Sequence, residues 1–235
     1  MEQQSRRARS WWRRPWIAPL AAVAIGFVAF SLPPYLSGNP TRSRVPPSFP
    51  LHYPILVAHV VFGSVALLCA CLQIWPWFRR NYRAVHRRIG RVYVFAGVLP
   101  AGLMALPMGA LSPFGPVARA SNVLMCSLWL AFTLTGYRRA RQRRFAEHRR
   151  WMIRSFTLTA SIITNRVWGP LAFVVLAPSL DTTFGGNQQL FQWTVAGIAT
   201  WLGWVLPLLV AEWWLERGDP ASRSGYVSVA RFEEV

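Results

Sequence analysis

Lysine is missing from this sequence, and all 26 basic residues among its 235 are arginine. Acidic residues are also scarce, with 8 in total, and charged residues make up 14% of the chain. An average soluble domain has about 25% charged residues, so the composition argues against an ordinary soluble fold. A basic set made of arginine alone is typical of a GC-rich genome.

Motifs for several common chemistries are missing as well. The 3 cysteines include no Cys-x-x-Cys pair, and Cys69 and Cys71 would point about 200° apart on a helix, which makes a poor chelate. We interpret the cysteines as small buried hydrophobic residues. The sequence also has no Gly-x-Ser-x-Gly string, no phosphate-binding loop and no pair of carboxylates inside an apolar stretch. Functions that depend on these motifs therefore have little support.

Long apolar runs are what the sequence does contain, and hydrophobic residues make up 53% of it. Each run is close to the roughly 20 residues that cross a bilayer as a helix. Backbone polar groups must be satisfied within a span, and the short alternating segments of a membrane β-barrel are missing. We therefore predict an all-α, polytopic transmembrane helical bundle. Its six spans are expected at residues 16–32, 54–78, 89–110, 121–137, 151–177 and 190–214.

The positions of the arginines predict the orientation of these spans. Counted over alternate gaps, 22 arginines lie on one side and 3 (Arg42, Arg44 and Arg119) on the other, while Arg166 lies inside a span. Cytoplasmic loops carry an excess of basic residues, so both ends of the chain are expected in the cytoplasm. The net charge of +18 is then mainly a signal of topology, and nucleic acid need not be a partner.

The same pattern divides the chain into three parts. Residues 1–15 form a basic cytoplasmic tail, residues 16–216 form the six-helix transmembrane domain, and residues 217–235 form a mobile cytoplasmic tail. The bilayer itself and the anionic lipid head groups of its inner face are the expected partners of the arginine-rich loops. The oligomeric state stays open.

A small set of polar side chains lies in or beside the spans, where ionisable groups are costly and usually paired or functional. Depth along the helices, at about 1.5 Å per residue, divides the set into two zones. The outer ligand-binding zone contains His59 and Arg166. The inner ligand-binding zone contains Gln73, His86, Arg91, His148 and Arg154.

Arg166 is the strongest candidate of the outer zone. It lies fifteen residues beyond Trp151, which is about 22 Å outward from the inner interface. Because that position is deep for snorkelling, we expect the side chain to face the bundle and to meet an acceptor or an anion. The alternatives are snorkelling for Arg166 and, for His59, the role of an ordinary satisfied histidine of the bundle.

His86 and His148 are the candidate metal ligands of the inner zone. Each lies in a short arginine-rich loop where a helix begins, and two imidazoles from different helices could ligate the iron of haem b. Flanking arginines could then hold the propionates. The same residues could instead bind backbone carbonyls or lipid phosphate. With four histidines in the chain, at most one bis-histidine haem fits on the inner side.

The strings around these histidines resemble a known family. His59, Gly63, Gln73 and Arg79 are followed by His86-Arg87-Arg88-Ile89-Gly90-Arg91-Val92-Tyr93, then by His148-Arg149-Arg150-Trp151-Met152-Ile153-Arg154-Ser155 and by Arg166. Over residues 54–170 this is similar to the bacterial multi-pass membrane proteins grouped as domain of unknown function 2306. The resemblance implies a helical protein of the bacterial cytoplasmic (inner) membrane, and it implies no activity.

Two functional classes follow from these residues. The first is a membrane protein without established catalysis, such as a transporter, a binder or an assembly partner. It would bind a small molecule or anion in a polar pocket within the bundle. The second is a membrane redox protein that holds haem b or a quinone through the inner histidines. Whether the chain is an enzyme stays open at this stage.

Overall fold

The computed structural model describes residues 16–217, and these residues are helical with no strand among them. Six of the helical segments are long and apolar enough to cross a membrane. They span Ile17–Leu36, His52–Ile74, Arg83–Ala110, Gly115–Arg141, Phe145–Ser179 and Gln188–Arg217. The predicted all-α class and the six spans are confirmed. The predicted tail at 1–15 and residues 218–235 of the second tail lie outside the described residues.

The helices follow one another with short connections. In chain order they are α2 (Ile17–Ser31), α3 (Pro33–Leu36), η1 (Pro40–Arg42), α4 (His52–Ile74), α5 (Pro76–Asn81), α6 (Arg83–Val92), the π-helix η2 (Tyr93–Val98), α7 (Leu99–Ala110), α8 (Gly115–Arg141), α9 (Phe145–Leu176), η3 (Ala177–Ser179) and α10 (Gln188–Arg217). The third span is thus built from α6, η2 and α7 in series.

Helix boundaries differ from the predicted ones mainly at the arginine-rich turns. The predicted span 54–78 is broken after Ile74, because Trp75 precedes Pro76 and takes an extended backbone with ψ 109°. Elsewhere the helices continue past the apolar residues, so that α9 begins at Phe145 rather than at residue 151. Arginine is a good helix former, and a fall in hydropathy does not end a helix.

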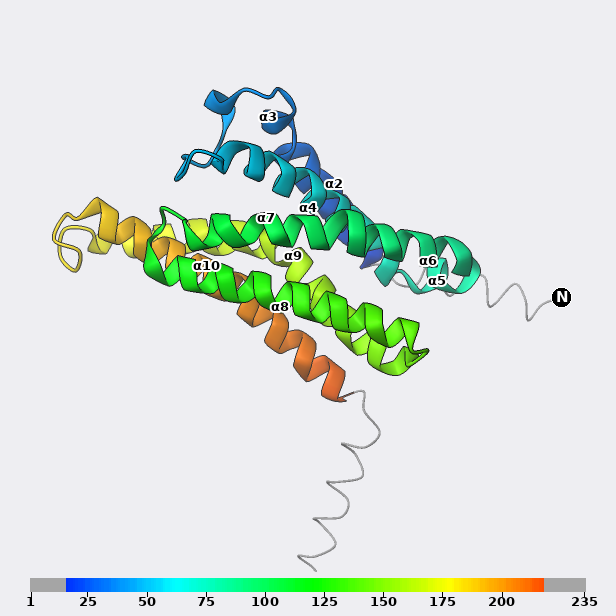
Figure 1. The fold of residues 1–235 in the computed structure, drawn as a ribbon. Coiled ribbons are helices and arrows are strands. Elements are labelled where there is room, and N and C mark those ends of the chain that lie inside the picture. The colour runs from blue at the N-terminus through cyan, green and yellow to red at the C-terminus, as the bar shows by residue number, and fades with distance from the viewer. Residues whose placement is uncertain (1–15, 218–235) are drawn as a thin grey trace, which may run out of the picture.

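Consecutive long helices pack against each other from α4 through α10, and α9 also contacts α4 (Figure 1). The helix α2 lies at the edge and packs mainly on α4, and within Ile17–Ser31 Ala24 alone is buried. We call the end of the bundle at residues 75–82, 142–144 and 217 the arginine-rich end. The opposite end, at residues 32–51, 111–114 and 177–187, is the proline-rich end.

Helix α4 and the π-helix η2 make a close backbone contact in the core. A Cβ atom on Gly97 would lie 2.9 Å from the Cα of Ala66, so glycine is needed at this crossing. The π-helix ends just before Pro100, which cannot donate a hydrogen bond to the carbonyl one turn earlier. The widened turn therefore coincides with a proline, a common cause of local helix distortion.

A proline also explains one side-chain contact between α9 and α10. Pro207 has no N–H, so the carbonyl of Gly203, four residues earlier, loses its helical partner. The hydroxyl of Thr164 on α9 donates to that carbonyl. The neighbouring Asn165 packs directly on Gly203, where any Cβ would collide with the Asn165 Oδ1.

The proline-rich end is covered by the connection between α2 and α4. His52 lies before the predicted span 54–78, but in the structure it is the first residue of α4 and is 2% exposed. Its Nδ1 lies 3.0 Å from the Ser48 hydroxyl, and its ring meets that of Phe49 edge-on. The guanidinium of Arg44 lies 3.9 Å from the centre of the Phe30 ring. These contacts fasten the connection to both helices.

Candidate functional site

The two histidine-containing strings of the sequence meet at their last residues. Tyr93 ends the first string and Ser155 ends the second, and the Tyr93 hydroxyl lies 2.7 Å from the Ser155 Oγ. The two residues are sixty-two positions apart and belong to η2 and α9. Both side chains are buried, with exposed fractions of 1% and 0%. The contact therefore joins the third span to the fifth inside the bundle.

Tyr93 and Ser155 belong to a buried network that also includes residues of α8. It has six contacts. The Tyr93 hydroxyl lies 2.7 Å from the Ser155 hydroxyl and 2.8 Å from that of Thr159, and Trp129 Nε1 donates to Thr159 Oγ1 at 2.9 Å. The Thr133 hydroxyl lies 2.7 Å from both the Ser155 hydroxyl and the Trp129 carbonyl, and the Thr159 hydroxyl lies 2.9 Å from the Ser155 carbonyl. None of the five side chains is more than 6% exposed. We call this set the hydroxyl network.

The hydroxyl network has fewer hydrogens than contacts. Four hydroxyl groups and one indole N–H supply five hydrogens to six contacts, so one contact lacks a hydrogen of its own at any time. Thr133 and Thr159 can turn toward a backbone carbonyl or toward a side chain. Every buried hydroxyl is satisfied in either arrangement, which is what a polar network inside a low-dielectric bundle requires.

His86 and His148 lie above this network, toward the arginine-rich end. Each is seven residues before its network residue, His86 before Tyr93 and His148 before Ser155. Seven residues are about two helical turns, or roughly 10 Å, so each histidine shares a helix face with the residue below it. The two predicted inner histidines thus lie at the same end of the bundle, one on α6 and one on α9.

The backbone around each histidine is held by the preceding helix. Gln73 of α4 donates from Nε2 to the His86 carbonyl at 3.0 Å, and a Cβ on Gly90 would lie 3.3 Å from the Gln73 Oε1. His148 Nδ1 lies 2.8 Å from the Gly136 carbonyl of α8. A carbonyl can only accept, so Nδ1 of His148 donates this hydrogen bond.

His86 differs from His148 in lacking such a contact. Its Nδ1 is buried and has no hydrogen-bond partner anywhere in residues 16–217. Three groups act on the His86 ring through their charge, namely Arg79, Arg87 and His148, and none of them is acidic. A buried polar atom without a partner is costly, and ordered water or a ligand commonly supplies the missing contact.

The remaining predicted residues of the inner zone do not join His86. Arg154 forms a two-pronged ion pair with Glu212 of α10, with distances of 2.5 Å from Nε to Oε1 and 2.6 Å from Nη2 to Oε2. Its guanidinium also lies 4.7 Å from the centre of the Trp151 ring. Arg91 is exposed on α6. The structure therefore gives Arg154 a partner within the chain, between α9 and α10.

In the outer zone, His59 has a partner within the bundle. Its Nδ1 lies 2.9 Å from the Ala101 carbonyl of α7, so the ring donates there. Arg166 does not face the bundle, and the expected orientation is wrong. It is exposed, as is Val167, and no ion pair or hydrogen bond of its side chain is found among the described residues. The physical reason is helical register, because the preceding Asn165 is the residue turned toward α10.

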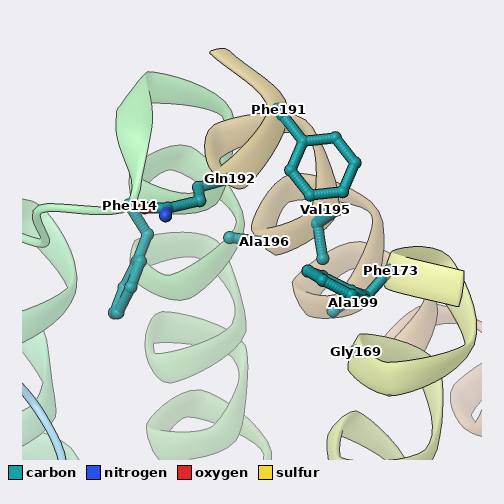
Figure 2. A pocket seen from close by; sticks show the side chains of 8 residues that line it. All are labelled: Phe114, Gly169, Phe173, Phe191, Gln192, Val195, Ala196 and Ala199. Atoms are coloured by element: carbon teal, nitrogen blue, oxygen red, sulfur yellow. The ribbon is translucent and has the colours of Figure 1, made fainter. Parts of the chain in front are cut away.

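The proline-rich end contains a groove of about 240 Å³ between α9 and α10 (Figure 2). Its walls are largely apolar, and Gln192 is the polar residue at its edge. The rings of Phe173 and Phe191 meet edge-on there, with centroids 5.4 Å apart. Neither His59 nor Arg166 lines the groove, so it is distinct from the polar outer pocket that the sequence suggested.

Sequence reasoning missed Trp129, Thr133 and Thr159, because isolated hydroxyl groups are common in membrane helices. The signal that could have found part of the network is the shared seven-residue spacing, His86 to Tyr93 and His148 to Ser155. Within the described part of the chain, no group of three or more His, Cys, Asp or Glu side chains is placed to hold a metal ion.

A family model matches most of the chain after the first span. It carries the description "Predicted membrane protein (DUF2306)" and matches residues 56–215. The chain belongs to this family. The match confirms the resemblance inferred from residues 54–170 and extends it through the last helix, so that Glu212, the partner of Arg154, also lies in the family region. No curated protein and no solved structure matches the chain.

Proposed function

We propose that this membrane protein binds a small molecule in the polar zone at its arginine-rich end, between His86 on α6 and His148 on α9. The observation that carries the proposal is the buried His86 Nδ1, which has no partner in residues 16–217 and lies within the residues that the family model matches. A neighbouring histidine and two arginines act on the same ring. The hydroxyl network below fixes the two helices that present the histidines.

The proposed site is reached from the end of the bundle rather than from its middle. His86 is the fourth residue of α6 and His148 the fourth of α9, so both lie close to the ends of their helices. Buried packing begins below them, at Tyr93 and Ser155. A ligand at this position would contact two helices whose relative register is fixed, which is the arrangement that a preorganised binding site needs.

The test is to identify what the protein retains on purification. Small molecules and lipids would be extracted from the wild-type chain, from His86→Ala and from Arg138→Gln, and compared by mass spectrometry. Arg138 is an exposed arginine of the same end and serves as the matched control. We expect a species that is retained by the wild type and the control and depleted in His86→Ala. Equal retention in all three proteins would contradict the proposal.

We also propose that the arginine-rich end faces the cytoplasm and that the protein resides in a bacterial cytoplasmic membrane. The support is the 22 to 3 division of arginines between alternate gaps of the sequence and the positive-inside rule. Labelling of single cysteines in a cysteine-free background tests it, with one at Ser43 and one at Gln142. A membrane-impermeant thiol reagent added to intact cells should label the first and leave the second unmodified, and the opposite result would reverse the orientation.

A second candidate function is a redox protein that holds haem b or a quinone through His86 and His148. The observation in its favour is the Nδ1 contact of His148 with Gly136, because metal-bound histidines usually donate their other ring nitrogen in this way. Absorption spectra of the purified protein, oxidised and dithionite-reduced, test the haem version. A reducible Soret band that is lost in His148→Ala would support it, and a colourless protein expressed with ample haem would exclude it.

A further inference from the structure

The exposed Arg166 and the groove at the proline-rich end lie along one face of α9. Gly169 and Phe173 line the groove (Figure 2), and they follow Arg166 by three and seven residues. Positions with these spacings share a helix face, and seven residues rise about 10 Å. Arg166 therefore lies one turn from Gly169, on the side of the groove toward the arginine-rich end.

Arg166 also lies deep in its span. It follows Trp151 by fifteen residues and precedes Leu176, the last residue of α9, by ten, which are roughly 22 Å and 15 Å along the helix. The Cα–Cβ bond tilts toward the N-terminus of a helix, here away from the nearer end of the span. Snorkelling is therefore disfavoured, and an exposed arginine at this depth is costly unless it meets an acceptor. Residues 16–217 supply no hydrogen bond or ion pair to its side chain.

We propose that this face docks a membrane-spanning helix of another protein that carries a carboxylate at the depth of Arg166. We call the surface the docking strip, and it consists of Arg166, Gly169, Phe173, Ala196 and Ala199. The inference is independent of the site at the arginine-rich end. A lone cation requires an acidic partner, and the groove of about 240 Å³ with small residues in its walls has room for side chains of a packed helix.

A second copy of the chain does not supply the carboxylate. The acidic side chains in residues 16–217 are Glu147, Asp181, Glu212 and Glu216. Three of them belong to the arginine-rich end, and Asp181 lies in the connection after α9 at the opposite end. Arg154, the partner of Glu212, is twelve residues from Arg166, or about 18 Å along α9. Because two copies inserted in the same direction bring equal depths together, the acid must come from a different chain.

A phospholipid head group is also poorly placed to pair with Arg166. Head groups lie outside the hydrocarbon core, which is about 30 Å thick, whereas Arg166 is nearer to the middle of its span than to either end. Acyl chains can fill the groove but offer no charge. An acidic side chain on a membrane helix provides both the carboxylate at this depth and the apolar surface beside it.

The test uses the full chain in phosphatidylcholine liposomes, with a donor fluorophore on a cysteine introduced at Gln142 in a cysteine-free background. The probe is an acceptor-labelled leucine–alanine transmembrane peptide with one central glutamate, and its control has glutamine instead. Energy transfer reports association. We expect the glutamate peptide to bind about tenfold more tightly than the glutamine peptide, and Arg166→Gln to abolish the difference. The melting temperature should be unchanged in Arg166→Gln, because the side chain is exposed.

Two further variants test the groove part of the docking strip. A Cβ on Gly169 would lie 3.9 Å from that of Ala199, which is an ordinary contact, so Gly169→Leu fills the groove. It should weaken binding of both peptides. Val167→Leu is the matched control, because Val167 is 62% exposed and does not line the groove, and binding should be unchanged.

Every other result overturns the inference. Equal binding of the two peptides, or a preference for glutamate that persists in Arg166→Gln, shows that Arg166 does not recognise a carboxylate. Energy transfer between labelled copies of the protein that is lost in Arg166→Gln identifies a second copy as the occupant. A preference for glutamate that disappears when phosphatidylglycerol is added to the liposomes identifies a lipid as the occupant.

Discussion

The two halves of the bundle are held together by different means. Toward the arginine-rich end, side chains from three spans form the hydroxyl network, and the ion pair of Arg154 with Glu212 connects α9 to α10. Toward the proline-rich end one buried pair of side chains, Trp204 Nε1 and Ser121 Oγ at 3.0 Å, joins α10 to α8, and other contacts run from a side chain to a backbone carbonyl. Examples are His59 to Ala101 and Trp193 Nε1 to Pro113 at 3.0 Å. The first half thus contains a connected network of buried side chains, whereas the second has separate contacts between individual helices.

The half toward the arginine-rich end contains the candidate ligand site, whereas in the other half the helices only need to pack. A network of side chains fixes the register of the helices that carry His86 and His148, and a misplaced partner would leave buried hydroxyls unsatisfied. A carbonyl inside a helix, such as that of Ala101, loses little when an extra donor is removed. We therefore expect substitutions to be more costly in the arginine-rich half, and four variants test this ranking.

The largest effect is expected for Arg154→Met. It leaves the partly buried Glu212 carboxylate without its partner, and we expect a loss of about 2 kcal/mol in unfolding free energy. The double variant Arg154→Met/Glu212→Met should recover most of the loss, because the uncompensated charge is gone. Denaturant unfolding in detergent micelles measures both. A double variant as unstable as Arg154→Met would show that the ion pair itself carries the contact between α9 and α10.

Tyr93→Phe should come next, with a loss of about 1 kcal/mol. The variant keeps the ring and removes the hydroxyl that contacts both Ser155 and Thr159, and hydrogen bonds within membrane bundles are individually of this size. Tyr82→Phe is the control, because Tyr82 is 48% exposed and its contacts with Trp77 and Phe78 are through the ring. Equal stability of the two variants in thermal unfolding would show that the Tyr93 hydroxyl does not stabilise the bundle.

A smaller and conditional effect is expected for Thr164→Val, in the half toward the proline-rich end. The substitution removes the donor to the Gly203 carbonyl, and we expect a loss below about 1 kcal/mol. In a Pro207→Ala background the helix itself can supply an N–H to that carbonyl, so Thr164→Val should then have no effect. A double-mutant cycle measures this coupling, and additive effects would refute the assignment of Pro207 as its cause.

Arg166→Ala should have the smallest effect on stability, less than about 0.5 kcal/mol, because the side chain is exposed and no contact of it is found in the described chain. The comparison with Arg154→Met tests directly whether the two arginines of α9 have different roles. A loss as large as that of Arg154→Met would restore the original expectation that Arg166 is held inside the bundle. Thermal unfolding of the two variants in the same detergent decides the matter.

The sequence predicted those features that depend on composition over many residues. Six apolar stretches gave six spans, because burial of a helix in lipid depends on the whole segment. Their ends were less predictable, since α8 runs through Arg138, Arg139 and Arg141 although the hydropathy falls there. Arginine continues a helix well, and the turn is placed instead near Arg143, which has a positive φ of 61°.

The candidate site was predictable to the extent that it depends on depth. The two histidines were expected at the same level, and each lies in the first turn of its helix at the arginine-rich end. The side of a helix on which a residue lies was not predictable in the same way. Arg166 was predicted to face the bundle from its depth alone. Its orientation follows from Asn165, whose contact with Gly203 could not be foreseen without knowing how α9 and α10 cross. The partner of Arg154 likewise depends on tertiary packing.

The edge helix α2 determines whether the number of membrane crossings is odd or even. The family match covers five spans, from α4 to α10, and five successive crossings leave the two ends of that region on opposite faces. Helix α2 adds a sixth crossing before it, and residues 16 and 217 then lie at the same face. Helix α2 contributes one buried residue to the fold. It nevertheless determines the membrane face at which a segment joined to its N-terminal end would lie.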